Sequence, residues 1–351
     1  MPSSAITDDL LAWYDVHART LPWRLPPGRG EQPDPYAVWL SEVMLQQTTV
    51  KAVIPYHRRF LERWPTVYDL AASTEADVMS EWAGLGYYSR ARNLYACARV
   101  VVEDYGGEFP RTAKELRTLP GIGDYTSASI AAIAFGEPVA VVDGNVERVI
   151  SRLVALDVPP AKAKRRVRDF VQDLVPDDRA ADFAQATMDL GATICTPRNP
   201  VCALCPIVEH CRAFANGDPL AYPVKAIKKD RPVRHGAAFV ARREDGAVLL
   251  VRRPAGGLLG GTVSVPMTQW SSRRDGRTDI GAAPFPAAWT HTGQAVHGFS
   301  HFEIVLDVFA ATVDHEPPPD MWWSDNPANE GLTTMLRRVL EAASILLPSR
   351  A

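Results

Sequence analysis

The sequence lacks several features that would place it in other classes of protein. It has no apolar run of the ~18 residues that a membrane-spanning helix needs. Its first ten residues, MPSSAITDDL, have neither the basic start nor the apolar stretch of a secretory signal. Its formal net charge is only −3, so no overall positive field attracts nucleic acid. A nucleic-acid role would therefore depend on local basic patches.

Cysteine is also scarce. Four of the five cysteines lie in one segment, "CTPRNPVCALCPIVEHC", which runs from Cys195 to Cys211. A disulfide framework would be spread along the chain, so we expect a metal centre in a reducing compartment. Zinc knuckles usually contribute two close pairs, whereas here Cys202 and Cys205 form one pair between two distant single cysteines. This C-x6-C-x2-C-x5-C spacing favours an iron–sulfur cluster, with zinc as the alternative. The fifth cysteine, Cys97, is predicted to be a core residue.

The hydrophobic period divides the chain into three parts. Residues 1–217 follow the helical period, with one helix break expected near Pro55. Residues 218–234 hold three prolines and five basic against two acidic residues, which indicates an interdomain linker or a strap that contacts phosphates. In residues 235–351, "GAAFVAR" and "GAVLLVRR" flank a hairpin signal, and a last amphipathic helix follows. We expect a multidomain protein, in which an all-α domain precedes a smaller α+β domain.

Two carboxylates stand out in the helical part. Glu42 lies in the apolar stretch "VWLSEVMLQQT", where burial would raise its pKa and suit it to general acid catalysis. The alternative is a solvated position on a helix face. Asp143 in "AVVDGNVERV" ends an apolar run, and its alternative role is to cap the helix that begins near Val146.

Phosphate contacts are expected at two places. "LPGIGDYTSASIAAIAF" contains a tight turn in a helix–hairpin–helix at 119–126, where Gly121 and Gly123 permit unusual backbone angles. The N–H groups at the start of the second helix would point outward, which suits a phosphate. Arg198, in the polar loop "TPRNPV", would present a cation.

These motifs in this order resemble the helix–hairpin–helix iron–sulfur DNA glycosylases. "WLSEVMLQQT", "GLGYYSRARNL", "LPGIGDYT", "VDGNVERV" and the cysteine loop are similar to those of MutY-type adenine DNA glycosylases. The resemblance implies a [4Fe–4S] cluster held by the four cysteines and two catalytic carboxylates, Glu42 and Asp143. It also implies that Tyr125 and Asn145 orient the reacting centre. Bifunctional relatives have a lysine nucleophile where this chain has Tyr125, so little strand cleavage is expected.

Contacts to the lesion are implied as well. Gln47 and Tyr87 would fill the space that the extruded base leaves. The C-terminal part resembles a Nudix-like domain through "RRPAGGLLGG" and "GFSHFEIVLDVF", which makes Ser300 the expected reader of an oxidised guanine, with Phe299 and His301 beside it. The chain has "TVSVP" where the family usually has Leu-Trp-Glu-Phe-Pro. It has no Glu-rich R-E-x-x-E-E motif between 235 and 351, so metal-dependent hydrolysis is not expected there.

The resemblance implies a monomeric enzyme of base excision repair that removes adenine opposite 8-oxoguanine or guanine in duplex DNA. Two alternatives remain: an endonuclease III-like bifunctional glycosylase for oxidised pyrimidines, and a non-catalytic iron–sulfur protein that binds lesions. Abundant Ala and Arg without a targeting segment suggest a bacterial cytoplasmic, nucleoid-associated protein, with nuclear and mitochondrial locations left open.

Overall fold

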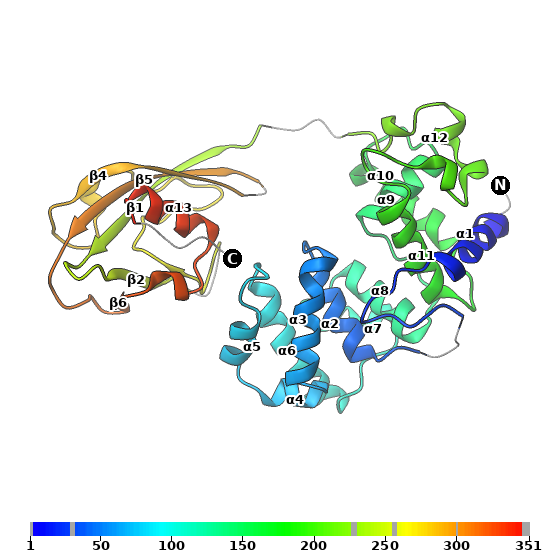
Figure 1. Cartoon of the computed structure of the whole chain (residues 1–351), viewed down its shortest axis with the longest axis horizontal. Helices are drawn as coiled ribbons and strands as arrows, with labels where there is room; N and C mark the ends of the chain where they lie inside the picture. Colours follow the sequence, from blue (N-terminus) through cyan, green and yellow to red (C-terminus); the bar gives the residue numbers. More distant parts are fainter. Residues whose placement is uncertain (1–2, 29–31, 226–229, 255–257, 300, 346–351) are drawn as a thin grey trace. The chain divides into compact units, whose positions relative to one another are not determined.

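The computed structural model describes residues 3–28, 32–225, 230–254, 258–299 and 301–345. The chain forms two compact units, Met1–Ile227 and Lys228–Ala351, and each is described by itself (Figure 1). The division falls inside the segment 218–234, although the sheet of the second unit already begins at Val233, before the expected boundary. No helix in the described ranges is long and apolar enough to cross a bilayer.

The first unit is helical. Short 3-10 turns, η1 to η3, occupy Cys202–Leu204, Val208–His210 and Pro219–Ala221. Its α-helices are α1 (Ser3–His17), α2 (Pro35–Leu45), α3 (Val50–Arg63), α4 (Val67–Ala72), α5 (Glu75–Glu81), α6 (Ser89–Tyr105), α7 (Ala113–Leu116), α8 (Asp124–Phe135), α9 (Gly144–Leu153), α10 (Pro160–Gln172), α11 (Ala180–Thr193) and α12 (Arg212–Ala215).

Helix α8 contributes to two hydrophobic cores. Ile130 packs in the core that α2 to α8 share, whereas Ala128 and Ala132 pack in the core formed with α1 and α9 to α11. Every residue of α8 from Thr126 to Ala134 is buried. A helix that is apolar on all sides is typical of the centre of a fold, and α8 lies between two lobes of the unit.

The expected helix break near Pro55 is wrong, because Pro55 lies inside α3. The chain breaks earlier, where Gln47 has a left-handed φ of 56°. Thr49 then caps α3 by accepting a hydrogen bond from the Ala52 N–H. A proline near the start of a helix removes one backbone donor, and the capped helix continues through it.

The second unit is built on a mixed sheet with strand order β3-β2-β1-β5-β4, and β6 also pairs with β2. The expected β1–β2 pairing is confirmed as antiparallel, while β1 and β5 run parallel in one register along their length. The elements are β1 (Val233–Arg242), β2 (Val248–Arg252), β3 (Val263–Ser264), η4 (Ile280–Ala282), β4 (Thr290–Gly298), β5 (Glu303–Thr312), β6 (Met321–Ser324), η5 (Pro327–Asn329) and α13 (Thr334–Ala342).

The sheet buries both of its faces. Leu336 and Leu340 of α13 pack with Ile304 and Leu306 of β5 on one face. Phe239 and residues of the neighbouring strands and loops form a separate core on the other face. Val263 and Val265 of the atypical "TVSVP" segment are buried, so part of this loop belongs to the core of the domain.

Candidate active site

One cavity of about 500 Å³ brings the predicted catalytic residues together. Glu42 comes from α2, Tyr125 from α8, and Asp143 and Asn145 from the start of α9. These residues are far apart in the sequence, and they come together because α2 and α11 both pack against α8 and α9 packs against α11. Among the other residues that line the cavity are Arg19, Trp23, Arg24, Gln46, Gln47, Gln185 and Met188.

The Glu42 carboxyl is buried, with only 6% of the residue exposed. The solvated alternative is therefore wrong. Ser129 Oγ donates a hydrogen bond to Glu42 Oε2 at 2.9 Å. Burial raises the pKa of Glu42, while hydrogen bonds from Ser129 and Tyr125 partly offset the increase. A carboxyl with a raised pKa can hold a proton near neutral pH and deliver it to a substrate.

Tyr125 lies between the two carboxylates. Its hydroxyl shares a hydrogen bond with Glu42. Burial raises the pKa of Tyr125 well above its usual value, and the nearby charges of Glu42 and Asp143 raise it further. The side chain therefore stays a neutral phenol that donates hydrogen bonds, and it cannot serve as an amine nucleophile.

Asp143 is the N-cap of α9, which confirms the capping interpretation, and it also lines the cavity. Its Oδ1 accepts a hydrogen bond from the Val146 N–H at 2.7 Å. Its Oδ2 accepts one from Asn145 Nδ2 at 2.8 Å. These two hydrogen bonds engage both oxygens of the carboxyl group at the start of α9. Asp143 is thus held in a fixed orientation at the cavity wall.

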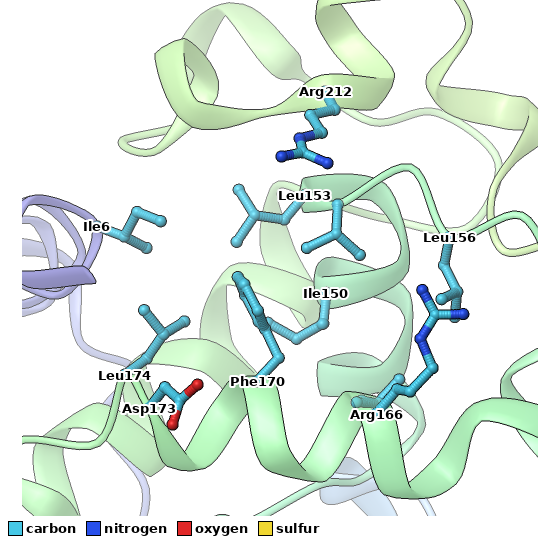
Figure 2. A pocket seen from close by; sticks show the side chains of 11 residues that line it. Ile6, Ile150, Leu153, Leu156, Arg166, Phe170, Asp173, Leu174 and Arg212 are labelled. Carbon is cyan, nitrogen blue, oxygen red and sulfur yellow. The ribbon is translucent and has the colours of Figure 1, made fainter. Parts of the chain in front are cut away.

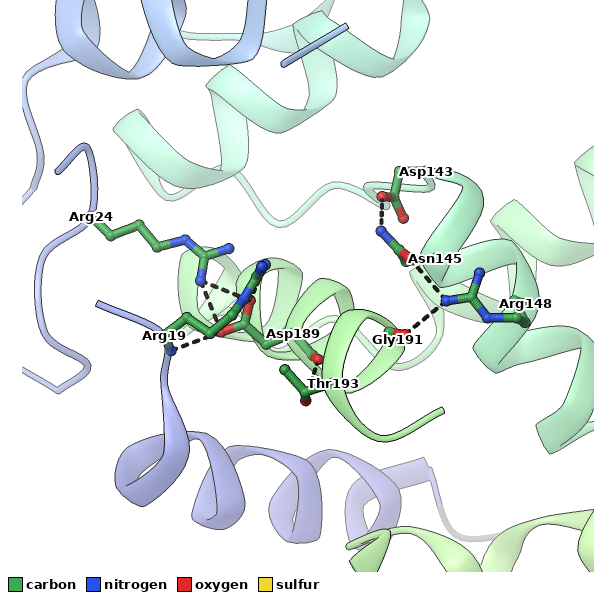
Figure 3. Close-up of polar contacts among 8 residues, drawn as sticks. All are labelled: Arg19, Arg24, Asp143, Asn145, Arg148, Asp189, Gly191 and Thr193. Atoms are coloured by element: carbon green, nitrogen blue, oxygen red, sulfur yellow. Dashed lines mark hydrogen bonds and ion pairs between the residues drawn. The ribbon is translucent and has the colours of Figure 1, made fainter. Parts of the chain in front are cut away.

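A further shell of contacts fixes Asn145 (Figure 3). Arg148 Nη2 donates to Asn145 Oδ1 at 2.9 Å and to the Gly191 carbonyl at 2.7 Å. Arg148 Nε donates to the Cys195 carbonyl at 2.8 Å. A Cβ on Gly191 would lie 2.7 Å from Asn145 Cβ, so only glycine allows α11 to approach this closely. The cysteine segment and α11 therefore support the start of α9.

The opposite side of the cavity is held by Asp189, whose side chain is fully buried. Arg24 Nη1 contacts both of its carboxylate oxygens, at 2.8 and 2.9 Å (Figure 3). Arg19 contacts the same carboxylate through its Nε at 2.7 Å and through its backbone N–H at 3.0 Å. Asp189 thus fixes two arginines that line the cavity.

Sequence reasoning missed several of these residues. Ser129 follows Tyr125 by one helical turn, a spacing that could have placed both beside Glu42. Arg24, Asp189 and Gln185 give no comparable signal, because their meeting depends on the tertiary fold. Gln185 lines the cavity, and its Oε1 has no hydrogen-bond partner among the described residues.

The four clustered cysteines follow α11 in one loop. Cys202, Cys205 and Cys211 interact electrostatically with one another or with Cys195. The fifth cysteine, Cys97, is fully buried, which confirms its predicted place in the core.

Arg152 supports the cysteine loop. Only 2% of this arginine is exposed. Its Nη1 donates to Cys195 Sγ at 3.2 Å and to the Thr196 carbonyl at 2.8 Å. A buried cation therefore lies against the first of the four clustered cysteines.

The two glycines of the expected hairpin, Gly121 and Gly123, differ in backbone conformation. Gly121 has a φ of 76°, and a Cβ there would lie 2.6 Å from Asn93 Cβ, so the expected constraint is confirmed. For Gly123 the expected unusual angle is wrong, because its φ is −96° and a Cβ would meet nothing within 4 Å. The open space at Gly123 leaves the N-terminus of α8 accessible. Arg198 is exposed in the cysteine loop.

Gln47 and Tyr87 both lie in short exposed loops. Gln47 lies between α2 and α3, and Tyr87 lies between α5 and α6. Tyr87 is 59% exposed, which rejects a core role for it. Both residues have left-handed backbones, with φ values of 56° and 49°. Left-handed conformations of non-glycine residues are costly and concentrate at functional sites.

A second cavity, of about 670 Å³, contains none of these residues (Figure 2). Its walls are mostly apolar and come from α1, α9 and α10, with Arg166 and Arg212 also lining it. It is larger than the carboxylate cavity but offers no pair of catalytic groups.

Two of the expected lesion-reading residues, Phe299 and His301, lie between β4 and β5. Ser300 lies outside the described residues. Phe299 stacks on Phe302 with ring centroids 4.7 Å apart, and its N–H donates to the Phe302 carbonyl at 2.8 Å. His301 is exposed. Phe299 is thus anchored in the domain core by Phe302.

Comparison with protein families agrees with this architecture. Residues 40–176 match the HhH-GPD superfamily of base excision DNA repair proteins, and residues 195–211 match the iron–sulfur binding domain of endonuclease III. Residues 237–342 match the NUDIX domain. A solved thermostable thymine-DNA glycosylase is 29% identical, with a TM-score of 0.54 over 60% of this chain and 95% of its own. The chain is a DNA N-glycosylase of base excision repair that carries a [4Fe–4S] cluster, and the segment that matches the iron–sulfur domain contains its four clustered cysteines.

The curated relatives narrow the class. Human adenine DNA glycosylase is 38% identical over 90% of this chain and 68% of its own length. The mouse enzyme is 35% identical over 96% of this chain and 77% of its own length. That of Mycolicibacterium smegmatis is 42% identical over 64% of this chain and 76% of its own length. The chain belongs to the adenine DNA glycosylase family.

Proposed function

We propose that this enzyme removes adenine mispaired with 8-oxoguanine or guanine in duplex DNA, and that it acts as a monomer without efficient strand cleavage. The observation that carries this proposal is the meeting of Glu42 and Asp143 in one cavity, with the pKa of Glu42 raised by burial. The relatives named adenine DNA glycosylase support adenine as the base. A non-catalytic lesion-binding protein would have no need of such a pair.

The glycosidic bond is inaccessible within the base stack, so the adenine nucleotide must leave the duplex and enter the cavity. Protonated Glu42 would donate to a ring nitrogen of adenine and make the base a neutral leaving group. Ionised Asp143 would stabilise the cationic sugar or attack it transiently, as in two-carboxylate glycoside hydrolysis. Glu42 would then act as the base that activates water. Tyr125 and Asn145 would orient these groups through their hydrogen bonds.

The polar wall supports recognition of the base. The free Oε1 of Gln185 offers an acceptor for an exocyclic amino group, and a base lacking that donor would leave it unpaired. Arg24 is held by Asp189 at the same cavity and offers donors for ring nitrogens.

DNA binding would use separate surfaces. The hairpin around Gly121 and Gly123, and Arg198 of the cluster loop, would contact phosphates. Gln47 and Tyr87 would enter the base stack beside the lesion. Phe299, Ser300 and His301 of the Nudix-like domain would recognise the oxidised guanine.

The test uses duplexes with adenine opposite 8-oxoguanine, guanine and cytosine, together with a duplex that contains thymine glycol. We expect adenine release opposite 8-oxoguanine and guanine, with strand breaks only after alkali. Release of thymine glycol with spontaneous strand breaks would support the endonuclease III-like alternative. Binding without release of any base would support the non-catalytic one.

A further inference from the structure

Arg90, the second residue of α6, is a buried cation without a buried anion. Only 7% of the residue is exposed, and no carboxylate in the described part of the chain forms an ion pair with it. A buried charge is costly unless hydrogen bonds compensate for its lost hydration. The partners of its guanidinium therefore indicate what the residue does.

One set of partners lies at the end of α2. Arg90 Nη1 donates to the carbonyls of Val43 and Met44 at 3.0 and 2.8 Å. These carbonyls belong to the last turn of α2, where no intrahelical N–H group is available. Arg90 Nη2 donates to Thr48 Oγ1 at 3.1 Å. The guanidinium thus fixes the end of α2 and the residue directly after Gln47.

The other set lies in the loop before α6. Arg90 Nη2 also donates to the carbonyls of Leu85 and Gly86, both at 3.3 Å. Trp82 Nε1 donates to the Gly86 carbonyl at 3.0 Å, and the Arg90 guanidinium lies 5.1 Å from the Trp82 ring centroid. Gly86 directly precedes Tyr87. One side chain therefore joins the two loops that present Gln47 and Tyr87.

We propose that Arg90 is a positioning residue that locks Gln47 and Tyr87 together in the geometry needed to enter the base stack. This inference rests on the lesion-side roles proposed above. Each of the two left-handed residues is next to a partner of Arg90. The hydrogen bonds of one guanidinium therefore keep both backbones in their left-handed conformation. Side chains that are ordered before binding lose less entropy when they enter DNA.

The planar fork of arginine is essential to this role. Its several donors diverge in fixed directions and reach both loops at once, whereas the ammonium group of lysine is a single compact donor. Arg90→Lys therefore keeps the positive charge and loses the hydrogen bonds that join the two loops. Val101→Ala is the matched control, because Val101 is fully buried on the same helix about three turns beyond Arg90.

The experiment measures binding of the cluster-loaded full chain to a duplex with a tetrahydrofuran abasic analogue opposite 8-oxoguanine. We expect Arg90→Lys to weaken this binding more than about tenfold and to leave binding to undamaged duplex unchanged. Amide hydrogen exchange should increase at 45–49 and 84–88. Val101→Ala should lower the melting temperature without a selective change in either measurement. Equal losses in both variants would reduce Arg90 to a stability role and overturn the inference.

A double-mutant cycle separates this inference from the proposed function. On a background that carries both Gln47→Ala and Tyr87→Ala, Arg90→Lys should weaken binding by less than about twofold, because the residue acts through these two side chains. Additive losses would overturn the positioning role. If Tyr87→Ala and Gln47→Ala bind the analogue like the unmodified protein, the lesion-side roles fail and the inference fails with them. If those variants are impaired and Arg90→Lys is not, only the inference fails.

Discussion

On the α2 wall of the cavity, the Glu42 carboxyl is buried and accepts hydrogen bonds from the hydroxyls of Ser129 and Tyr125. On the α9 wall, the Asp143 carboxylate accepts from a backbone N–H and an amide at the start of a helix. The first environment raises the pKa of Glu42, whereas the second fixes the orientation of the Asp143 side chain. The comparison teaches that the position of each carboxyl group in the fold sets what it can contribute to the site.

Replacing Glu42, the proposed acid, should have the largest effect on adenine release. Glu42→Gln keeps the size of the side chain but removes the transferable proton, so adenine release should fall by about 10³-fold or more. Single-turnover kinetics on an adenine·8-oxoguanine duplex measures the loss. Binding to that duplex should persist, and turnover near the original rate would reject Glu42 as the acid.

The matching change on the α9 wall is Asp143→Asn. Asparagine also caps helices, so the melting temperature should stay nearly constant. The negative charge beside the developing cation is lost, and single-turnover adenine release should fall by about 10²-fold or more. A variant with full activity would show that the cap is the whole role of Asp143.

A change behind the α9 wall should have a smaller effect. In Gly191→Ala the new methyl group would press on Asn145, which orients Asp143. We expect adenine release to fall by about tenfold, since small misplacements of catalytic groups are costly. Product binding should change little. Gly144→Ala, where a Cβ meets nothing within 4 Å, is the control for an added methyl group.

The smallest expected effect is that of Ser129→Ala on the pH dependence of adenine release. Ser129 lowers the pKa of Glu42 by hydrogen bonding, so Ser129→Ala should raise that pKa further. In the proposed mechanism adenine release requires protonated Glu42 and falls as pH rises through its pKa, so the alkaline limb of the pH–rate profile should move upward. A pH–rate profile measures this, and a downward shift would contradict the assignment.

The free energy of unfolding should also depend on the protonation of Glu42. Because the folded pKa of Glu42 is raised, its protonation favours the folded state most below the unfolded pKa, and this contribution is lost as pH rises through the folded pKa. Glu42→Gln should remove this part of the pH dependence of unfolding. Chemical denaturation of both proteins across that range tests the linkage.

Much of the active site was predictable because its motifs are local. A carboxylate in an apolar helix, as at Glu42, and an Asp-Gly-Asn turn, as at Asp143, are visible in the sequence. The helix break near Pro55 was placed wrongly because a left-handed Gln47 and the Thr49 cap ended the pattern earlier. Local signals from capping and backbone angle outweighed the proline.

The supporting residues could not be predicted because they act across the fold. Asp189 meets Arg19 and Arg24 from α11, far along the chain. Arg148 links Asn145 to the cysteine segment only because Gly191 lets two helices touch. No sequence period marks such meetings, because they depend on how distant helices pack.

Helix α8 has a consequence for how the first unit unfolds. Because its buried residues belong to both hydrophobic cores, neither lobe can lose its packing without exposing a face of the same helix. The two lobes should therefore melt as one cooperative block and not in succession. The cavity beside α8 would then exist either complete or not at all, which protects the chain from partly assembled and inactive forms.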